Sequence, residues 1–156
     1  MAENSLIALG DDRVCEFLRL ARVAHLATAN REALPHNIPL CFCFDGATRF
    51  YFVIDEKPKL RPGGGLRRMR NIAENPRVAL VVDHYEEDWG CLAYVLVHGT
   101  AHVVEDPNEY MLGLRNLRDK YPQYRAMALN PERNPMVRID AARVHVWGER
   151  FRPQTK

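Results

Sequence analysis

The connections between extended segments are the feature that most restricts how this sequence can fold. Early in the chain, three segments rich in alternating or β-branched apolar residues follow one another, at residues 23–29, 36–44 and 49–54. Only a turn at residues 30–33 and an Asp45-Gly46 hairpin signal separate them. Parallel neighbours need crossovers of about a dozen residues or more, so these segments predict antiparallel strands.

The rest of the chain adds further strands and a few helices to this pattern. We expect strands at residues 77–84, 91–105 and 137–147, and helices at residues 13–22, at 66–74 and between Asp106 and Tyr121. Gly99, inside the long fifth strand, indicates a bulge or a bend. The order predicts a mainly β fold, an antiparallel β-barrel with peripheral helices rather than a Rossmann fold. We expect a single domain over residues 1–156, with its core at about 12–148.

Charge and cysteine content exclude several classes of protein. The chain carries 22 Lys and Arg against 20 Asp and Glu, and the net charge of +2 is too small to indicate nucleic-acid binding by itself. The four cysteines show neither a CxxC motif nor zinc-type spacing, so we expect no metal site. The sequence shows no signal-peptide pattern, and no apolar run reaches the roughly 18 residues of a membrane span. We therefore expect a cytoplasmic protein.

A basic segment at residues 57–77 is the strongest candidate for a binding site. It holds seven of the 22 basic residues and a single acid, Glu74. Arg67 and Arg68 fall in the first turn of the expected helix, where each cation faces the positive end of the dipole at a cost of about 0.3–1 kcal/mol. An anion held by these side chains and the free backbone N–H groups would offset that cost, and the glycines at 63–65 let the backbone approach closely. The segment predicts a phosphate site. The alternatives are a solvated basic face and a nucleic-acid contact, which no helix-turn-helix or aromatic RNA-binding motif accompanies.

Residues that could carry catalysis themselves are harder to identify. Four histidines alternate with apolar residues inside the expected strands, as is typical of the face of a sheet: His25, His98, His102 and His145. His36 and His84 lie near strand ends, where sites tend to be built, but no HExxH, GxSxG or Walker motif occurs. An anion site and aromatic residues without an evident nucleophile favour chemistry carried out by a bound cofactor.

Several motifs, taken together, resemble a known family. They are Arg22-Val-Ala-His-Leu-Ala-Thr, Leu34-Pro-His-Asn-Ile-Pro-Leu, Asp55-Glu-Lys-Pro-Lys, Val82-Asp-His-Tyr-Glu-Glu-Asp-Trp, His98-Gly-Thr-Ala and the run from Leu66 to Leu80. On these motifs the chain resembles the pyridoxamine 5'-phosphate oxidase-like flavin split β-barrels, over roughly residues 12–148. The Lys-Pro-Lys and Asp-His-Tyr-x-x-Asp-Trp motifs are most similar to a branch of coenzyme F420-dependent enzymes.

The resemblance implies a cofactor-binding role for particular residues. Arg67 and Arg68 match consecutive basic residues that grip the cofactor phosphate in the family. Lys57 and Lys59 match further contacts to the phosphate or the polar tail.

The resemblance also implies where the cofactor ring lies. The strand around Asn37, Ile38 and Pro39 would lie along an isoalloxazine-type ring, with Ile54 facing it. The family is dimeric with the cofactor at the subunit interface, so we expect a homodimer. In this dimer, Trp147 of the partner chain would form part of the wall of the site.

The sequence departs from the family at two places, which restricts the substrates and the cofactor contacts that the resemblance implies. Asn37 and Phe42 stand where pyridoxamine phosphate oxidases have basic residues, which argues against vitamin B6 substrates. The loop at residues 60–65 is longer than is usual in the branch, which leaves the roles of Lys59 and Arg61 open.

The resemblance implies an oxidoreductase that uses bound FMN or coenzyme F420 to transfer a hydride to or from a small organic substrate. Neither a nucleic acid nor a membrane is expected as a partner. The alternative is a module of the same fold that carries a cofactor or haem without turnover, because no residue is identifiable as a proton donor.

Overall fold

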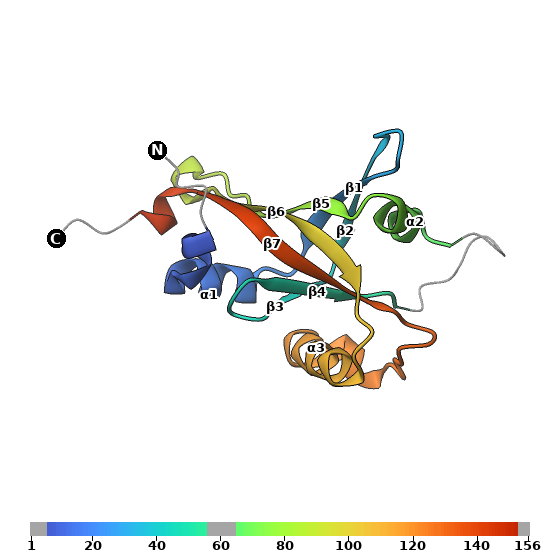
Figure 1. Ribbon diagram of the computed structural model, residues 1–156. Helices are drawn as coiled ribbons and strands as arrows, with labels where there is room; N and C mark the ends of the chain where they lie inside the picture. The colour runs from blue at the N-terminus through green and yellow to red at the C-terminus, as the bar shows by residue number, and fades with distance from the viewer. Residues whose placement is uncertain (1–5, 56–64, 153–156) are drawn as a thin grey trace.

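The structure is a computed structural model that describes residues 6–55 and 65–152 (Figure 1). Within these residues, a seven-stranded sheet has the order β2-β1-β5-β6-β7-β4-β3, and all of its neighbouring strands are antiparallel. The strands are β1 (Ala24–Ala29), β2 (Pro35–Leu40), β3 (Cys43–Phe44), β4 (Arg49–Val53), β5 (Arg77–His84), β6 (Ala93–Val103) and β7 (Met136–Trp147).

The two edge strands are consecutive in the chain, so the sheet must curl. β2 and β3 are joined only by Cys41 and Phe42, although they lie at opposite edges of the strand order. Phe42 is buried, and its N–H donates to the hydroxyl of Tyr121 at 3.1 Å. This contact replaces a sheet partner and divides the single strand expected at residues 36–44 into two. The expected antiparallel β-barrel with peripheral helices is confirmed, as a curled half-barrel.

Three α-helices surround the curled sheet in the described segments (Figure 1). α1 (Asp12–Leu20) and α2 (Arg67–Glu74) lie at opposite ends, and α3 (Pro107–Lys120) packs against β3 and β4. Asp11 and Asp106 cap α1 and α3 by accepting hydrogen bonds from backbone N–H groups of the first turn. Short 3-10 turns complete the described chain: η1 (Leu6–Gly10), η2 (Trp89–Cys91), η3 (Pro122–Ala126) and η4 (Glu149–Phe151). None of the helices in these segments is long and apolar enough to cross a membrane.

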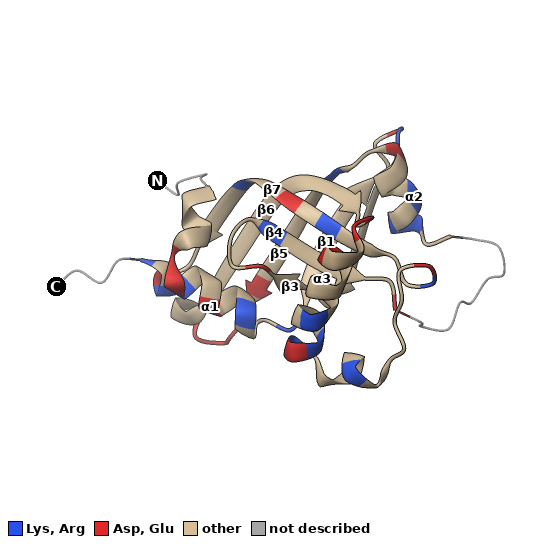
Figure 2. Cartoon of the chain, turned by 60° about the horizontal axis from the view of Figure 1, so that its bottom comes forward, with Lys and Arg blue, Asp and Glu red and all other residues tan. Residues whose placement is uncertain are grey.

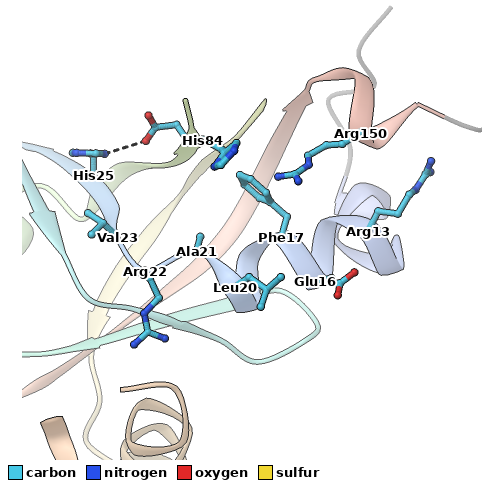
Figure 3. Close-up of a pocket in the computed structure, with 11 residues that line it drawn as sticks. Arg13, Glu16, Phe17, Leu20, Ala21, Arg22, Val23, His25, His84 and Arg150 are labelled. Atoms are coloured by element: carbon cyan, nitrogen blue, oxygen red, sulfur yellow. Dashed lines mark ion pairs between the residues drawn. The ribbon is translucent and has the colours of Figure 1, made fainter. Parts of the chain in front are cut away.

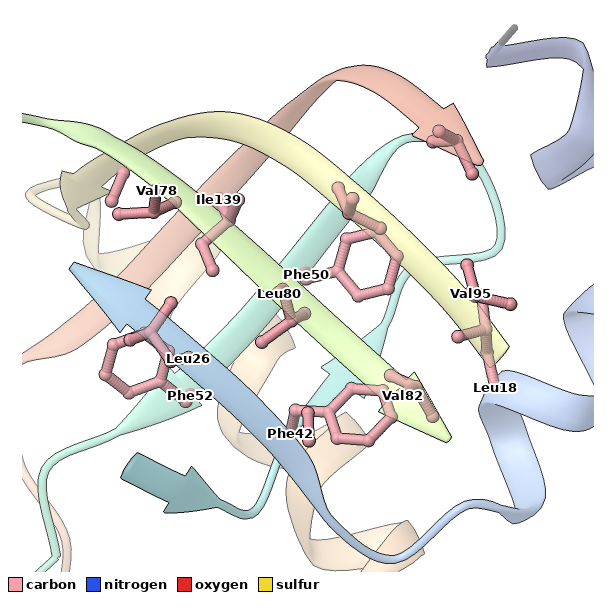
Figure 4. Packing of buried hydrophobic residues seen from close by; sticks show 14 of the residues in the cluster. Leu18, Leu26, Phe42, Phe50, Phe52, Val78, Leu80, Val82, Val95 and Ile139 are labelled. Carbon is pink, nitrogen blue, oxygen red and sulfur yellow. The ribbon is translucent and has the colours of Figure 1, made fainter. Parts of the chain in front are cut away.

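Alternate residues of the strands fill the interior of the half-barrel (Figure 4). β4 is buried on both faces, because Phe50 and Phe52 point into the barrel core while Tyr51 and Val53 pack beneath α3. The same alternation leaves the outer faces of β1 and β5 partly exposed. The candidate site lies along this outer face and at the neighbouring end of α2.

Gly99 interrupts the pairing of β6, as the sequence predicts. The register between β6 and β7 shifts between His98 and Gly99. A Cβ added at Gly99 would collide with the backbone oxygen of Asp140 and would lie 3.0 Å from Cγ2 of Ile139. The bulge therefore depends on a close approach of two backbones that only glycine permits.

We expect Gly99→Ala to lower the free energy of unfolding by about 1–3 kcal/mol, because overpacking against a rigid backbone cannot relax easily. Gly10→Ala is the matched control, since nothing lies within 4 Å of an added Cβ at Gly10. Urea denaturation followed by circular dichroism measures both variants. Equal stability of the two variants would contradict the close approach at the bulge.

Candidate functional site

The N-terminus of α2 gathers positive charge on a short helix (Figure 2). Arg67, Arg68 and Arg70 lie on this helix, and its N-cap residue Leu66 makes no side-chain capping hydrogen bond. The first N–H groups of an α-helix have no intrahelical acceptor and carry partial positive charge. This end of α2 therefore offers backbone N–H groups and guanidinium groups to the same ligand.

A buried hydrogen bond fixes α2 against β1. Asn71 Nδ2 donates to Thr28 Oγ1 at 3.0 Å, and both residues are buried. Ile72, next to Asn71, is packed in the barrel core. Because both contacts lie in the middle of the helix, they hold its N-terminal turn at a fixed place on the sheet.

Arg68 is half-buried and incompletely paired at this place. Its Nε is buried and has no hydrogen-bond partner among the described residues. Burial lowers the pKa of the Arg68 guanidinium, while the nearby Asp55 and Tyr124 act in the opposite direction. A buried N–H without an acceptor costs about 1–3 kcal/mol, so Arg68 is poised for an acceptor that the described residues do not supply.

His36 brings a second unsatisfied atom to the same region from β2. Its Nδ1 is buried and has no hydrogen-bond partner in the described part of the chain. Burial lowers the pKa of His36, and the charges of Arg67 and Arg68 lower it further. The imidazole and the two guanidinium groups therefore lie within electrostatic reach of one another. An anion placed among them would satisfy groups that repel one another.

Asp55 and Tyr124 lie near Arg68, and the sequence did not predict a role for either residue in the site, although Asp55 begins one of the family motifs. Tyr124 Oη donates to Asp55 Oδ2 at 3.3 Å. Burial raises the pKa of Tyr124, so the phenol remains a donor to the carboxylate. The carboxylate of Asp55 supplies negative charge near the half-buried guanidinium.

A shallow slot of about 320 Å³ lies on the outer face of the sheet. Ala27 of β1 and Ala79 of β5, which pair across the two strands, lie in its lining together with the larger residues His25, Val81, Asp83 and Tyr94. Asn37, which pairs with Ala27 across β1 and β2, lines its edge. The small side chains of the two alanines leave room for a planar ring, and Asn37 provides a polar contact at one side.

The predicted ring-contacting residues fall into two groups. Asn37 and Pro39 lie on the exposed side of β2, and Asn37 lines the slot. Ile38 and Ile54 instead pack with the barrel core. Trp147, at the end of β7, is 48% exposed and stacks on Tyr94, a residue of the slot, with ring centroids 5.7 Å apart.

The predicted phosphate contacts are only partly described. Arg67 and Arg68 lie together at the start of α2, with His36 nearby. Lys57 and Lys59 lie outside the described residues, as does most of the loop at residues 60–65.

Comparisons with known sequences give a family match over nearly the whole chain. The sequence model of the family described as pyridoxamine 5'-phosphate oxidase matches residues 11–148. A 5a,11a-dehydrotetracycline/5a,11a-dehydrooxytetracycline reductase of Streptomyces rimosus is 29% identical over 133 residues, which are 85% of this chain and 78% of the relative.

Solved structures share the fold at lower identity. The conserved hypothetical protein Rv2991 of Mycobacterium tuberculosis superimposes with a TM-score of 0.71 at 20% identity, covering 94% of this chain and 90% of the other. HutZ, the heme storage protein of Vibrio cholerae, superimposes with a TM-score of 0.67 at 14% identity, covering 88% and 96%. At these identities the likeness establishes the fold alone.

We expect Arg67→Gln to raise the pKa of His36 without restoring its ordinary value of 6.5, because burial, the larger cause of the shift, remains. Arg70→Gln is the matched control, since Arg70 is exposed and does not contribute to the shift of His36. Titration of the imidazole signals by NMR measures both variants. A pKa of His36 that responds to Arg70 rather than Arg67 would contradict the arrangement.

Proposed function

This chain belongs to the pyridoxamine 5'-phosphate oxidase family, and we propose that it is an oxidoreductase that works with a bound flavin-type cofactor. The curled half-barrel is the split β-barrel of this family. The proposal rests on the family, on the geometry at the start of α2 and on the reductase relative from Streptomyces rimosus.

Two buried nitrogen atoms without a hydrogen-bond partner among the described residues are the main support for the proposal. Arg68 Nε and His36 Nδ1 come from different elements, and the charge of Arg68 is felt at His36. A phosphate offers several strong acceptor oxygens and two negative charges, so it fits the N–H of Arg68, the Nδ1–H tautomer of His36 and the uncapped end of α2.

The parts of such a cofactor match the parts of the site. Arg67, Arg68 and His36 would hold the phosphate, and Lys57 and Lys59 would add contacts to it or to the polar tail. Asn37 and the two alanines of the slot would receive the ring. When bound, a flavin or deazaflavin supplies hydride transfer, and the protein supplies position and electrostatics.

We propose FMN or coenzyme F420 as the cofactor and a small conjugated organic molecule as the substrate. Both cofactors need residues that bind a phosphate group and a flat slot that accepts the ring. The reductase relative, named for dehydrotetracyclines, supports reduction of a conjugated ring system over oxidation of a vitamin B6 compound.

We further propose that the protein acts as a homodimer. The outer sheet face exposes part of Ala79 and Val81 on β5, and Trp147 on β7, which stacks on Tyr94 of the intervening strand β6, is 48% exposed. A half-exposed apolar sheet face is typical of an interface between subunits. A second subunit on this face would cover the slot and exclude water from the ring.

A cofactor or haem carrier of the same fold is the second candidate function. The structural likeness to HutZ, a heme storage protein, supports it. Turnover separates the candidates, because a carrier binds its ligand without repeated reduction of added substrate.

We expect Arg68→Glu to abolish binding of FMN and F420, a loss of about a hundredfold or more, because the phosphate would meet a carboxylate instead of a guanidinium. Arg70→Glu on the exposed side of the same helix is the matched control and should retain binding. Fluorescence titration measures affinity, and sedimentation should show an unchanged dimer for both variants. Cofactor retained by Arg68→Glu would overturn the site assignment.

The identity of the cofactor can be read from the purified protein. We expect a co-purifying molecule with a flavin or deazaflavin absorption spectrum and the mass of FMN or F420. A haem Soret band, with no affinity for either flavin-type cofactor, would contradict the oxidoreductase proposal and favour the carrier.

A further inference from the structure

A second, larger cavity opens at the other end of β1 (Figure 3). Its volume is about 720 Å³, within the range of roughly 300–1,000 Å³ that small organic ligands occupy. The cavity lies between α1, the residues that lead into β1, the end of β5 and η4. Phe17, Ala21 and Val23 form much of its apolar wall.

The cavity continues into the slot through a shared pair of residues. His25 and Asp83 line both spaces, and His25 Nδ1 lies 3.4 Å from Asp83 Oδ1. His25 lies on the same side of β1 as Ala27, and two residues along a strand span about 6.6 Å. A molecule in the cavity would therefore approach a ring in the slot at His25.

One cation of the cavity is available to a ligand. Arg13 is paired with Asp11 at 2.6 Å, and Arg22 donates to the backbone oxygen of Lys120. Arg150 makes no ion pair within 4 Å among the described residues, and its Cζ lies 5.4 Å from the ring centroid of Phe17. The guanidinium makes no hydrogen bond to a carboxylate among the described residues, although its charge contributes to the lowered pKa of Glu86, after the larger effect of the hydrogen bond with His84.

The side chains of this wall converge. Figure 3 shows Phe17, His84 and Arg150 pointing toward one another, while Arg22 points away from them. His84 Nε2 contacts Glu86 Oε1 at 2.6 Å, which orients its imidazole. An apolar wall beside a guanidinium is suited to a flat apolar molecule that carries an acidic group.

We propose that this cavity binds the substrate and that the substrate is an aromatic or conjugated organic anion, such as a carboxylate, a phenolate or an enolate. Its acidic group contacts Arg150, its ring system packs on the apolar wall at Ala21 and Val23, and its reacting end meets the cofactor slot at the His25–Asp83 pair. The identification of this ligand as the substrate rests on the proposed function, whereas the cavity and its chemistry do not.

The test uses the full-length, cofactor-free protein with 2-naphthoate as the anionic probe and 2-naphthamide as its neutral counterpart. We expect 2-naphthoate to bind by calorimetry and Arg150→Gln to weaken it about tenfold, since a hydrogen bond to a charged group is lost. Arg143→Gln removes the same charge from an exposed residue of β7 that does not line the cavity, and it should leave the affinity unchanged.

NMR of the histidine side chains locates the probe. The signal of His25 should respond to 2-naphthoate and, separately, to FMN or F420. His102 is the internal control, because it forms a comparable pair with Asp140 at 3.5 Å on another part of the sheet. Its signal should respond to neither ligand.

The outcomes separate this inference from the proposed function. In the Arg68→Glu variant, the response of His25 to the cofactor should disappear while its response to 2-naphthoate remains. Loss of both responses, equal binding of 2-naphthamide, or unchanged affinity in Arg150→Gln would overturn the cavity assignment. A wild-type protein that binds 2-naphthoate but neither cofactor would overturn the proposed function and support the cavity as an anion site.

Discussion

The hydrogen bond between Asn71 and Thr28 determines where the candidate site lies, because it fixes α2 on the sheet. Both side chains are buried, so breaking the bond would leave a polar group unsatisfied in the interior at a cost of about 1–3 kcal/mol. With α2 held there, Arg68 is half-buried at the first turn and cannot turn fully to solvent. Its Nε and the Nδ1 of His36 have no hydrogen-bond partner among the described residues.

The sequence predicts much of the fold because local patterns decide it. Period-two alternation marks the strands, and Gly99 marks the bulge that the register shift confirms. The division between β2 and β3 escapes prediction because it depends on a contact between Phe42 and Tyr121, which are far apart in the chain. The start of α2 stands out in the sequence because two arginines at a helix N-terminus break a local electrostatic rule. The approach of Asp55 and Tyr124 to Arg68, and the pairing of His25 with Asp83, arise only from tertiary folding.

The proposed work is divided among three regions: the start of α2, which packs on the core side of β1, and two spaces on the outer face of the sheet. The start of α2 would hold charge, the slot at Asn37 would hold a planar ring, and the cavity beyond His25 would hold the molecule that reacts. Relatives in fold include a heme storage protein, so the fold alone does not decide the activity. In this chain the choice rests on side chains, above all on Arg68 Nε and His36 Nδ1, which have no hydrogen-bond partner among the described residues.

The proposed function depends above all on the start of α2 binding the phosphate of a flavin-type cofactor. A crystal structure of the protein soaked with FMN or F420 tests it most directly. The account predicts a phosphate oxygen within hydrogen-bond distance of Arg68 Nε and of His36 Nδ1. A cofactor bound with its phosphate elsewhere, and with both atoms still unpaired, would contradict the account.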